Sequence, residues 1–177
     1  MAIEAEIDGM RLISTNVRRT HITELLVLDL LLGNKLVGKC HYFQGRGYYP
    51  PWIELDYDPW PRGLGLEVKL FRVFYDILPD QGRFFISYVR DRDTLNMLQS
   101  GFSPVDTPLG LSLLRAGFTW FKNWYFPEGG NEGGLKLQAN KVLREEDRRR
   151  ELEELSAEVK TPEARQVIAE MLAKGKP

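Results

Sequence analysis

The first 58 residues consist of short runs rich in Ile, Leu and Val, and dipeptides that contain glycine interrupt these runs. "AIEAEI" is followed by Asp8-Gly9 and then by "MRLISTNV", while "ITELLVLDLLL" is followed by Gly33-Asn34 and then by "KLVGKCHYF". Such dipeptides supply the positive φ angles that tight hairpins need. The pattern therefore predicts a meander of antiparallel strands, with "WIELDY" as a further strand after a loop rich in Gly and Pro.

A helical pattern begins directly after the segment Arg62-Gly63-Leu64-Gly65. The apolar residues that follow have helical spacing, namely Leu66, Leu70, Phe71, Phe74 and Ile77. Pro79 and Gly82 end this helix, and "RFFISYV" has the composition of the next strand. A strand–helix–strand crossover inside an otherwise antiparallel sheet is an α+β arrangement, so we expect a mixed, mostly antiparallel sheet.

The rest of the chain is predicted to form two short helices, two strands and a charged tail. "TLNMLQSGF" is predicted to contain a short helix with Gly101 just past its end. "TPLGLSLLRAGF" is predicted to contain another, with Thr107 as N-cap and Pro108 in the first turn. "TWFKNWYF" and "LKLQANK" are predicted to be strands. From about Lys141 the sequence becomes strongly charged and predicts two C-terminal helices. We therefore divide the chain into a domain of residues 1–140 and a helical extension of residues 141–177.

Charge and composition exclude several classes of function. Lys and Arg number 24 against 25 Asp and Glu, so the basic excess of a nucleic-acid-binding protein is missing and no nucleic-acid partner is expected. No run approaches the ~18 apolar residues of a membrane span, and the N-terminus lacks the layout of a secretory signal. The single cysteine cannot form an internal disulfide. These features together predict a cytoplasmic protein.

The cysteine and the histidines give no metal site. Two His and one Cys are too few for zinc, so no metal is expected. Cys40 alternates with Leu36, Gly38 and Tyr42, which predicts a small buried residue, and His41 would then lie on the other face of the strand.

The segment from Arg62 to Leu66 has the features of a phosphate-binding turn. The first backbone N–H groups of a helix lack internal partners and carry the positive end of the helix dipole. A phosphate can accept hydrogen bonds from these groups, and Gly63 and Gly65 have no side chain to block its approach, while Arg62 adds a cation. The alternative is an ordinary tight turn that enters a helix, which is the commoner explanation of Gly-x-Gly alone.

The stretch "LDYDPWPRGLGL" resembles the coenzyme A signature of the GNAT superfamily of N-acyltransferases. In that signature a strand ends in hydrophobic-x-Pro, here Tyr57-Asp58-Pro59, and an Arg follows three residues later before the glycines that open a helix. "LLRAGF", with Gly117-Phe118, resembles a second junction of that family. The order of elements from Trp52 to Gln138 is also similar, so the resemblance covers roughly half of the chain.

The resemblance implies a GNAT-like fold that binds acetyl-CoA or another acyl-CoA as co-substrate and transfers the acyl group to an amine. It also implies that the strand of Leu55 and Tyr57 diverges from "RFFISYV", with the pantetheine arm in the gap. The cofactor-binding residues implied are Leu55, Tyr57, Arg62, Gly63, Leu64, Gly65 and Leu66.

Glu54 is the implied general base, because an acidic residue often stands three positions before the hydrophobic residue of the signature. Alternation places Trp52, Glu54 and Asp56 on one face of the strand, so these carboxylates could instead simply face solvent. Tyr88 and Tyr125 are candidate general acids, or tyrosines of the core or its rim.

Four features depart from the family pattern. Glu67 stands where the signature has Gly or Ala, and Leu113 stands where a general-acid tyrosine often lies. No helix is predicted between Asp8 and Glu24, and "DRDTLNMLQSGFSPVD" is an additional segment. The cofactor half of the resemblance therefore has more support than the acceptor half.

Two apolar surfaces remain to be placed. The aromatic run from Trp120 to Phe126 predicts core on one side, and an exposed second side would be a wall of the acceptor pocket or an oligomer interface. The C-terminal helices carry apolar stripes that could pack together on the domain or on a second subunit, as in a homodimer. The stripes consist of Leu152, Leu155 and Val159, and of Val167, Ile168, Met171 and Leu172.

Three functions are consistent with these patterns. The first is a GNAT-like N-acyltransferase. The second is a non-catalytic GNAT-like binding or assembly module, which Glu67 and Leu113 favour. The third is an α+β domain without a nucleotide site, whose C-terminal helices bind a partner.

Overall fold

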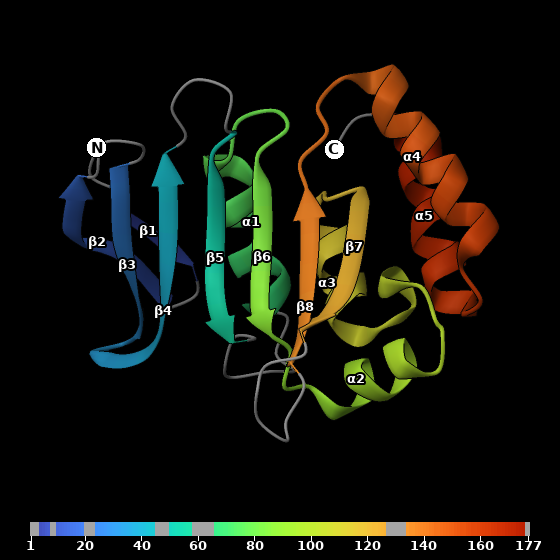
Figure 1. Ribbon diagram of the computed structural model, residues 1–177. Helices are drawn as coiled ribbons and strands as arrows, with labels where there is room; N and C mark the ends of the chain where they lie inside the picture. The colour runs from blue at the N-terminus through green and yellow to red at the C-terminus, as the bar shows by residue number, and fades with distance from the viewer. Residues whose placement is uncertain are drawn as a thin grey trace.

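The computed structural model describes residues 4–7, 10–19, 24–44, 50–57, 66–126 and 134–175. Within these residues, eight strands form one sheet in the order β1-β2-β3-β4-β5-β6-β8-β7 (Figure 1). The strands are β1 Glu4–Ile7, β2 Met10–Arg19, β3 Glu24–Leu32, β4 Lys35–Gln44, β5 Trp52–Tyr57, β6 Arg83–Tyr88, β7 Trp120–Phe126 and β8 Gly134–Asn140. The predicted α+β class is confirmed.

The helices follow the predicted order. They are α1 Leu66–Ile77, α2 Arg92–Gln99, the 3-10 turn η1 Pro104–Asp106, α3 Pro108–Ala116, α4 Glu145–Glu158 and α5 Pro162–Lys174. Helix α1 joins β5 to β6, which pair in parallel, while the other pairs in the described part of the sheet are antiparallel. The predicted strand–helix–strand crossover is therefore confirmed. None of the helices in the described residues combines the length and apolar composition needed to cross a membrane.

The N-terminal strands form the predicted meander. Gly33 has a φ of 60° in the turn between β3 and β4, where a hairpin needs a left-handed residue. The register shifts in this hairpin, because Leu30 pairs with Gly38 but Leu31 pairs with Leu36. This irregularity turns the Leu36 side chain outward, where it is 46% exposed, so the alternation expected from Cys40 stops before Leu36. Asp8-Gly9 lies outside the described residues.

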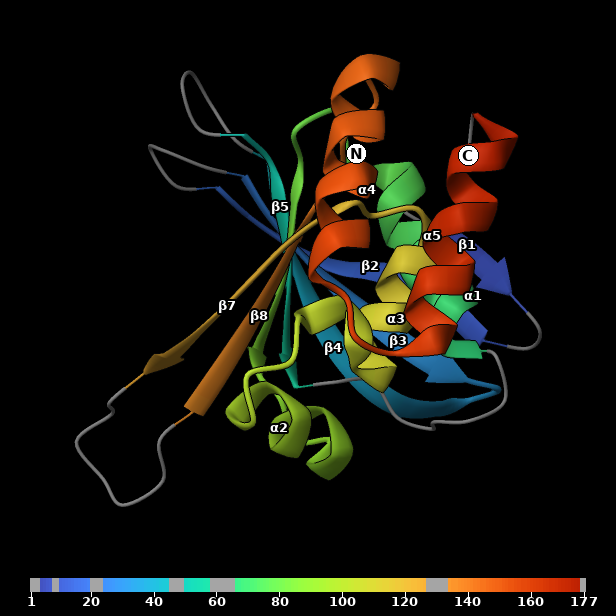
Figure 2. The same ribbon diagram turned by 90° about the vertical axis from the view of Figure 1, so that its right-hand side faces the viewer.

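The main core lies between the sheet and helices α1 and α3 (Figure 2). The Phe84 ring of β6 lies 5.4 Å from the rings of Phe71 and Phe74 and 5.8 Å from that of Phe118. These four side chains are fully buried. Burying an aromatic side chain of this size contributes about 1.5–3 kcal/mol, so this group strongly favours the helices on this face.

The C-terminal helices α4 and α5 complete the same layer. Their apolar stripes pack together and against η1 and α3, in a second core of Val105, Leu111, Leu114, Leu152, Leu155, Val159, Ala164 and Ile168. The prediction that the stripes pack on the domain is confirmed. The change in composition at Lys141 sets residues 145–174 apart in the sequence. In the structure these residues nevertheless share a core with η1 and α3.

Candidate functional site

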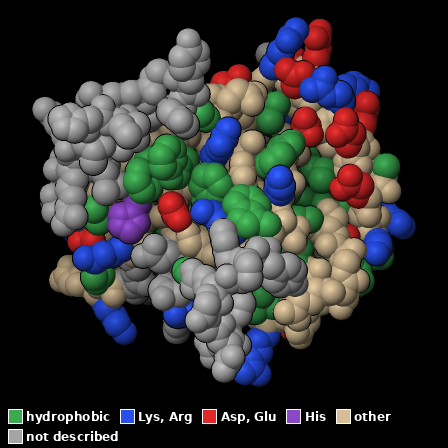
Figure 3. All heavy atoms as spheres, viewed as in Figure 1, with side chains coloured by type: hydrophobic (Ala, Val, Ile, Leu, Met, Phe, Trp, Pro, Cys, Tyr) green, Lys and Arg blue, Asp and Glu red, His purple; other side chains and the backbone are tan. Residues whose placement is uncertain are grey.

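The face of the sheet opposite the helices carries the candidate site. Helices α1, α3, α4 and α5 all lie on one side of the sheet in Figure 2, and none of the helices in the described residues lies over the other face of β4 to β8. Side chains on this open face are half-buried, and hydrophobic groups lie among single charged ones (Figure 3). The residues of the open face include His41, Phe43, Trp52, Glu54, Phe85, Ser87, Trp124 and Lys136.

Glu54 lies at the centre of this face and is engaged by two neighbours. The Ser87 hydroxyl donates a hydrogen bond to Glu54 Oε1, and Lys136 Nζ lies 3.6 Å from the same oxygen. The side chains of Lys136 and Glu54 are 18% and 26% exposed, so the ion pair is partly withdrawn from water. Within the described residues Glu54 makes no other hydrogen bond or ion pair, so its second oxygen, Oε2, keeps its capacity to accept one.

Two aromatic rings also lie close to the Lys136 ammonium group. Its Nζ lies 4.5 Å from the ring centroid of Phe85 and 5.8 Å from that of Trp124, and the two rings meet edge to face at 6.3 Å. Both distances are within the range of a cation–π interaction. We call Glu54, Phe85, Ser87, Trp124 and Lys136 the open-face cluster.

Tyr88 lies on the same face, although simple alternation predicts the opposite. Ile86 and Val89, three positions apart, are both buried in the main core, and the Val89 N–H donates to the Leu135 carbonyl. Val89 lies beyond the end of β6, and the pairing of β5 with β6 keeps a regular register to Tyr57↔Tyr88. A Cβ atom on Gly134 would lie 2.9 Å from the Tyr88 ring, and Gly134 alternates with Lys136 in β8. The ring thus lies on the open face, beside the start of β8.

The other predicted site residues are only partly placed. Leu55 is buried in the main core, on the helix side of the sheet. Tyr57 ends β5, Leu66 begins α1, and Tyr125 pairs with Leu135 in β7, but their side chains are outside what the structure describes. The segment Arg62, Gly63, Leu64 and Gly65 also lies outside the described residues. Helix α1 begins directly after it, as expected.

Strands β5 and β6 remain paired where the resemblance implies that they diverge. Their parallel register extends from Trp52↔Arg83 to Tyr57↔Tyr88, which are the last residues of the two strands. The gap expected for the pantetheine arm is therefore not open along β5. An acyl-CoA that followed this route would have to separate the ends of the strands or pass beyond them.

The structure places most of the residues at which the sequence departs from the GNAT pattern. Leu113, in α3, is fully buried in the main core and has no proton to donate. Glu67 lies in the first turn of α1 and is half-buried. The residues described between Asp8 and Glu24 belong to strands, and the additional segment forms α2 and η1.

Cys40 and His41 follow their predictions. Cys40 is 1% exposed in the main core, and His41 is half-buried on the open face, 6.3 Å from the Phe43 ring. Among the residues that the structure describes, no three His, Cys, Asp or Glu side chains gather in a way that could hold a metal ion.

A second group of buried polar side chains has a structural role. Lys141 Nζ donates to the carbonyls of Tyr75 and Leu78, near the end of α1, and lies 4.5 Å from the Tyr75 ring. Burial lowers the pKa of Lys141 and raises the pKa of Tyr75. A cation at a helix C-terminus offsets the negative end of the dipole, which accounts for a buried lysine here.

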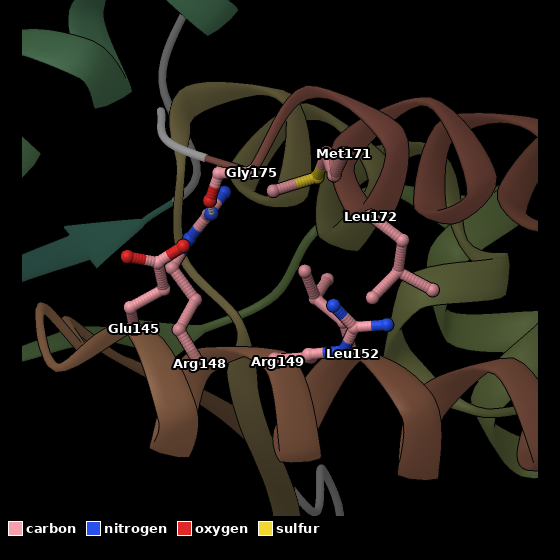
Figure 4. A pocket seen from close by; sticks show the side chains of 7 residues that line it. All are labelled: Glu145, Arg148, Arg149, Leu152, Met171, Leu172 and Gly175. Carbon is pink, nitrogen blue, oxygen red and sulfur yellow. Dashed lines mark hydrogen bonds between the residues drawn. The ribbon is translucent and has the colours of Figure 1, made fainter.

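Arg148 acts in the same way at the end of α5. Its Nη1 donates to the Gly175 carbonyl at 3.2 Å, and burial lowers its pKa. Arg148, Leu152 and Met171 line a cavity of about 30 Å³ between α4 and α5. Figure 4 shows these side chains at the two helices. A cavity of this size holds a water molecule or two and is too small for a substrate.

Sequence reasoning did not identify Phe85, Ser87 or Lys136 as site residues. Lys136 alternates with Leu135 and Leu137, which is a signal that it lies on the face opposite the core. Its contact with Glu54 depends on the order β5-β6-β8, in which β8 is inserted between β6 and β7. That insertion is not visible in local sequence patterns.

Comparisons with known proteins reveal the family but no function. A crystal structure of a protein of unknown function from Aquifex aeolicus VF5 is similar, with a TM-score of 0.64 and 28% identity over 97% of this chain and 92% of that one. No curated protein matches the chain. Residues 8–162 match the family described as "Protein of unknown function (DUF1122)". Because this match spans most of the sequence, the chain belongs to the DUF1122 family.

Proposed function

We propose that the protein is an N-acyltransferase that transfers an acetyl or other acyl group from acyl-CoA to an amine. The observation that carries the proposal is the parallel crossover β5-α1-β6, in which α1 begins directly after Arg62-Gly63-Leu64-Gly65. Backbone N–H groups at the start of a helix lack acceptors within the helix itself, and those of α1 would bind the pyrophosphate of the co-substrate. Glu54 in β5 supports binding of an amine acceptor, because its Oε2 has no hydrogen-bond or ion-pair partner within the described residues.

Acyl transfer to an amine needs a general base, a general acid and a thioester bound in a fixed position. Glu54 would take one proton from the substrate ammonium, and the neutral nitrogen would then attack the thioester carbonyl. As the C–N bond forms and the C–S bond breaks, a tyrosine would protonate the CoA thiolate and regain a proton from the nitrogen. Tyr88 is the better placed acid, because its ring shares the open face with Glu54. Tyr125 remains a candidate by its position in β7.

A non-catalytic binding module is the second candidate. Glu54 is paired with Lys136 and Ser87, and the position of the expected tyrosine holds the buried Leu113. The parallel strands also stay paired to Tyr57↔Tyr88. These observations favour a protein that has this fold but does not catalyse acyl transfer. A cytoplasmic location and a homodimer stay predictions in either case.

The proposal is tested by calorimetric titration of CoA into wild type, Arg62→Ala and Arg92→Ala. Arg92 is exposed on α2, so its removal changes the net charge equally at a place away from α1. Loss of a charged hydrogen-bond donor should weaken CoA binding by about tenfold or more in Arg62→Ala, whereas Arg92→Ala should match wild type. Absence of CoA binding to the folded wild type at millimolar concentration would overturn the proposal.

A further inference from the structure

One cross-strand row on the open face joins five strands. Phe43 of β4 lies opposite Trp52 of β5, which pairs with Arg83 of β6. Arg83 also pairs with Asn140 of β8, and Asn140 pairs with Trp120 of β7. Alternation places these five side chains on the open face, because in each strand the next residue packs in or against the main core. We call Phe43, Trp52, Arg83, Asn140 and Trp120 the aromatic row.

The rings of the aromatic row keep part of their surface exposed. Phe43 and Trp52 stack with their ring centroids 4.4 Å apart and an interplanar angle of 13°, and both residues are half-buried. Trp120 is also half-buried, and it lies three strand steps from Trp52, a separation of about 14 Å. Rings placed in this way on a sheet can stack on different bases of one nucleic-acid strand, because every base has a π-face.

Two cations lie beside these rings without an acidic partner among the described residues, namely Arg83 and Lys122. Both are exposed, and Lys122 Nζ lies 6.0 Å from the ring centroid of Trp124. The charge of Glu54, on the same face, is already compensated by its ion pair with Lys136. Figure 3 shows basic side chains next to hydrophobic ones on this face. The described part of the face therefore carries an excess of positive charge, although the net charge of the chain is −1.

This charge distribution favours a polyanion that also presents rings. Phosphates of a single-stranded nucleic acid pair with cations, and its unpaired bases stack on aromatic side chains. A proline-rich peptide would use the rings but would leave the two cations without a role. The net charge predicted no nucleic-acid partner because Arg83 and Lys122 belong to β6 and β7, which α2 and α3 separate in the sequence. No basic run therefore marks the surface on which they meet.

We propose that the aromatic row, together with Lys122, binds single-stranded nucleic acid. Bases stack on Trp52 and Trp120, and phosphates pair with Arg83 and Lys122. The inference does not rest on the proposed transferase function, because neither the Glu54 carboxylate nor the start of α1 takes part in this binding.

The experiment follows the fluorescence anisotropy of a labelled oligo(dT) of about 12 nucleotides, a length within the site sizes of single-strand-binding modules. Wild type is compared with Lys122→Gln, Arg83→Gln and Trp52→Leu. Lys174→Gln is the matched control, because Lys174 is exposed at the end of α5, on the helix side of the sheet, and the variant loses an equal charge. A duplex of the same length has no unpaired bases, and poly-L-glutamate is a polyanion without bases.

Wild type should bind oligo(dT), and its affinity should fall as the salt concentration rises. Lys122→Gln and Arg83→Gln should each weaken binding by about threefold or more at low salt, and each should make the slope of log K against log[salt] shallower by about 0.7. Trp52→Leu should weaken binding by about fivefold or more and leave this slope unchanged, as the loss of a stacking contact requires. Lys174→Gln should match wild type.

Equal affinities of Lys122→Gln and Lys174→Gln would overturn the inference. Equal binding of the duplex, or displacement of oligo(dT) by an equal charge concentration of poly-L-glutamate, would do the same, because either result means that the bases are not recognised. Absence of oligo(dT) binding to the folded wild type in low-salt buffer would also overturn it. Circular dichroism checks the fold of each variant, and the exposed position of Lys122 keeps the test decisive even if Trp52→Leu does not fold.

Discussion

Asp106 holds the N-terminus of α5, 55 residues farther along the chain, through the backbone and hydroxyl of Thr161. Its Oδ1 accepts hydrogen bonds from Thr161 N and Oγ1, both at 2.8 Å, and the carboxylate also accepts from Lys160 N. Thr161 is in turn the N-cap of α5, where its hydroxyl accepts from Ala164 N. One buried carboxylate in η1 thus satisfies the donors at the turn between the two C-terminal helices.

The first prediction follows from this contact. Asp106→Ala should lower the free energy of unfolding by about 1–3 kcal/mol, because it leaves the partly buried backbone N–H groups of Lys160 and Thr161 without their acceptor. Asp93→Ala is the control, since Asp93 is exposed in the first turn of α2. Urea unfolding followed by circular dichroism measures both. Equal urea midpoints for the two variants would show that Asp106 does not stabilise the attachment of α5.

The second prediction concerns Tyr75 and alkaline pH. Its pKa is raised mainly by burial, so the folded state keeps the phenol proton where the unfolded chain has lost it. The unfolded state then binds fewer protons above pH ~10, and the free energy of unfolding falls as the pH rises. Tyr75→Phe removes this dependence, so its stability relative to wild type should increase between about pH 9 and pH 11.

Lys141 has the opposite effect on the alkaline profile, because its pKa is lowered by burial. This contribution is present in both proteins and largely cancels in their difference. Near pH 7 the two proteins should differ by only about 1 kcal/mol, since the Tyr75 hydroxyl makes no hydrogen bond within the described residues. Urea titrations at several pH values measure the difference, and parallel profiles would contradict the role of Tyr75.

Most of the architecture could be predicted because its local signals agree. Thr107 caps α3 by accepting from Gly110 N, and Gly117 ends the helix with a φ of 117°, both as the sequence predicts. Helix α1 likewise begins at Leu66, directly after the glycine segment. These features depend on residues a few positions apart, so sequence patterns are sufficient to locate them.

The candidate site could be predicted only in part because it depends on strand order and on contacts between distant strands. The resemblance implies Glu54 as a base from its position in the signature, but its partner Lys136 reaches it only because β8 is inserted between β6 and β7. The Tyr88 ring lies beside Gly134 at the start of β8, and nothing in "RFFISYV" indicates that contact. The alternation of apolar and polar residues in a sequence does not indicate which distant strands pair or where a bulge lies.

The third prediction tests Glu54 as a base. Glu54→Gln keeps the shape of the side chain but cannot accept the proton, so acyl transfer from acetyl-CoA to n-butylamine should slow by ~10²–10⁴. CoA affinity should stay unchanged, because the pyrophosphate is expected at α1. Glu158→Gln is the control, as this residue is exposed at the end of α4. Release of the CoA thiol measures the rate, and equal rates for the two variants would return Glu54 to a structural role.

The last prediction concerns Glu67, the residue that departs from the coenzyme A signature of the GNAT superfamily. Its carboxylate lies in the first turn of α1, where it stabilises the free helix by complementing the positive end of the dipole. A pyrophosphate bound at the same end would be repelled by it. If the protein binds acyl-CoA, Glu67 must point away from the phosphates, and Glu67→Ala should leave CoA affinity similar or modestly tighter.

The non-catalytic alternative predicts a different pair of results for Glu67. Wild type should then bind no CoA at millimolar concentration, and Glu67→Ala should gain some binding as the repulsion is relieved. Titrations at low and high salt identify the cause, because an electrostatic gain shrinks when the charges are screened. A gain that is independent of salt would instead indicate relief of steric crowding at the first turn of α1. If neither protein binds CoA at either salt concentration, the glycine segment is an ordinary turn, and the likeness to acyltransferases is one of fold alone.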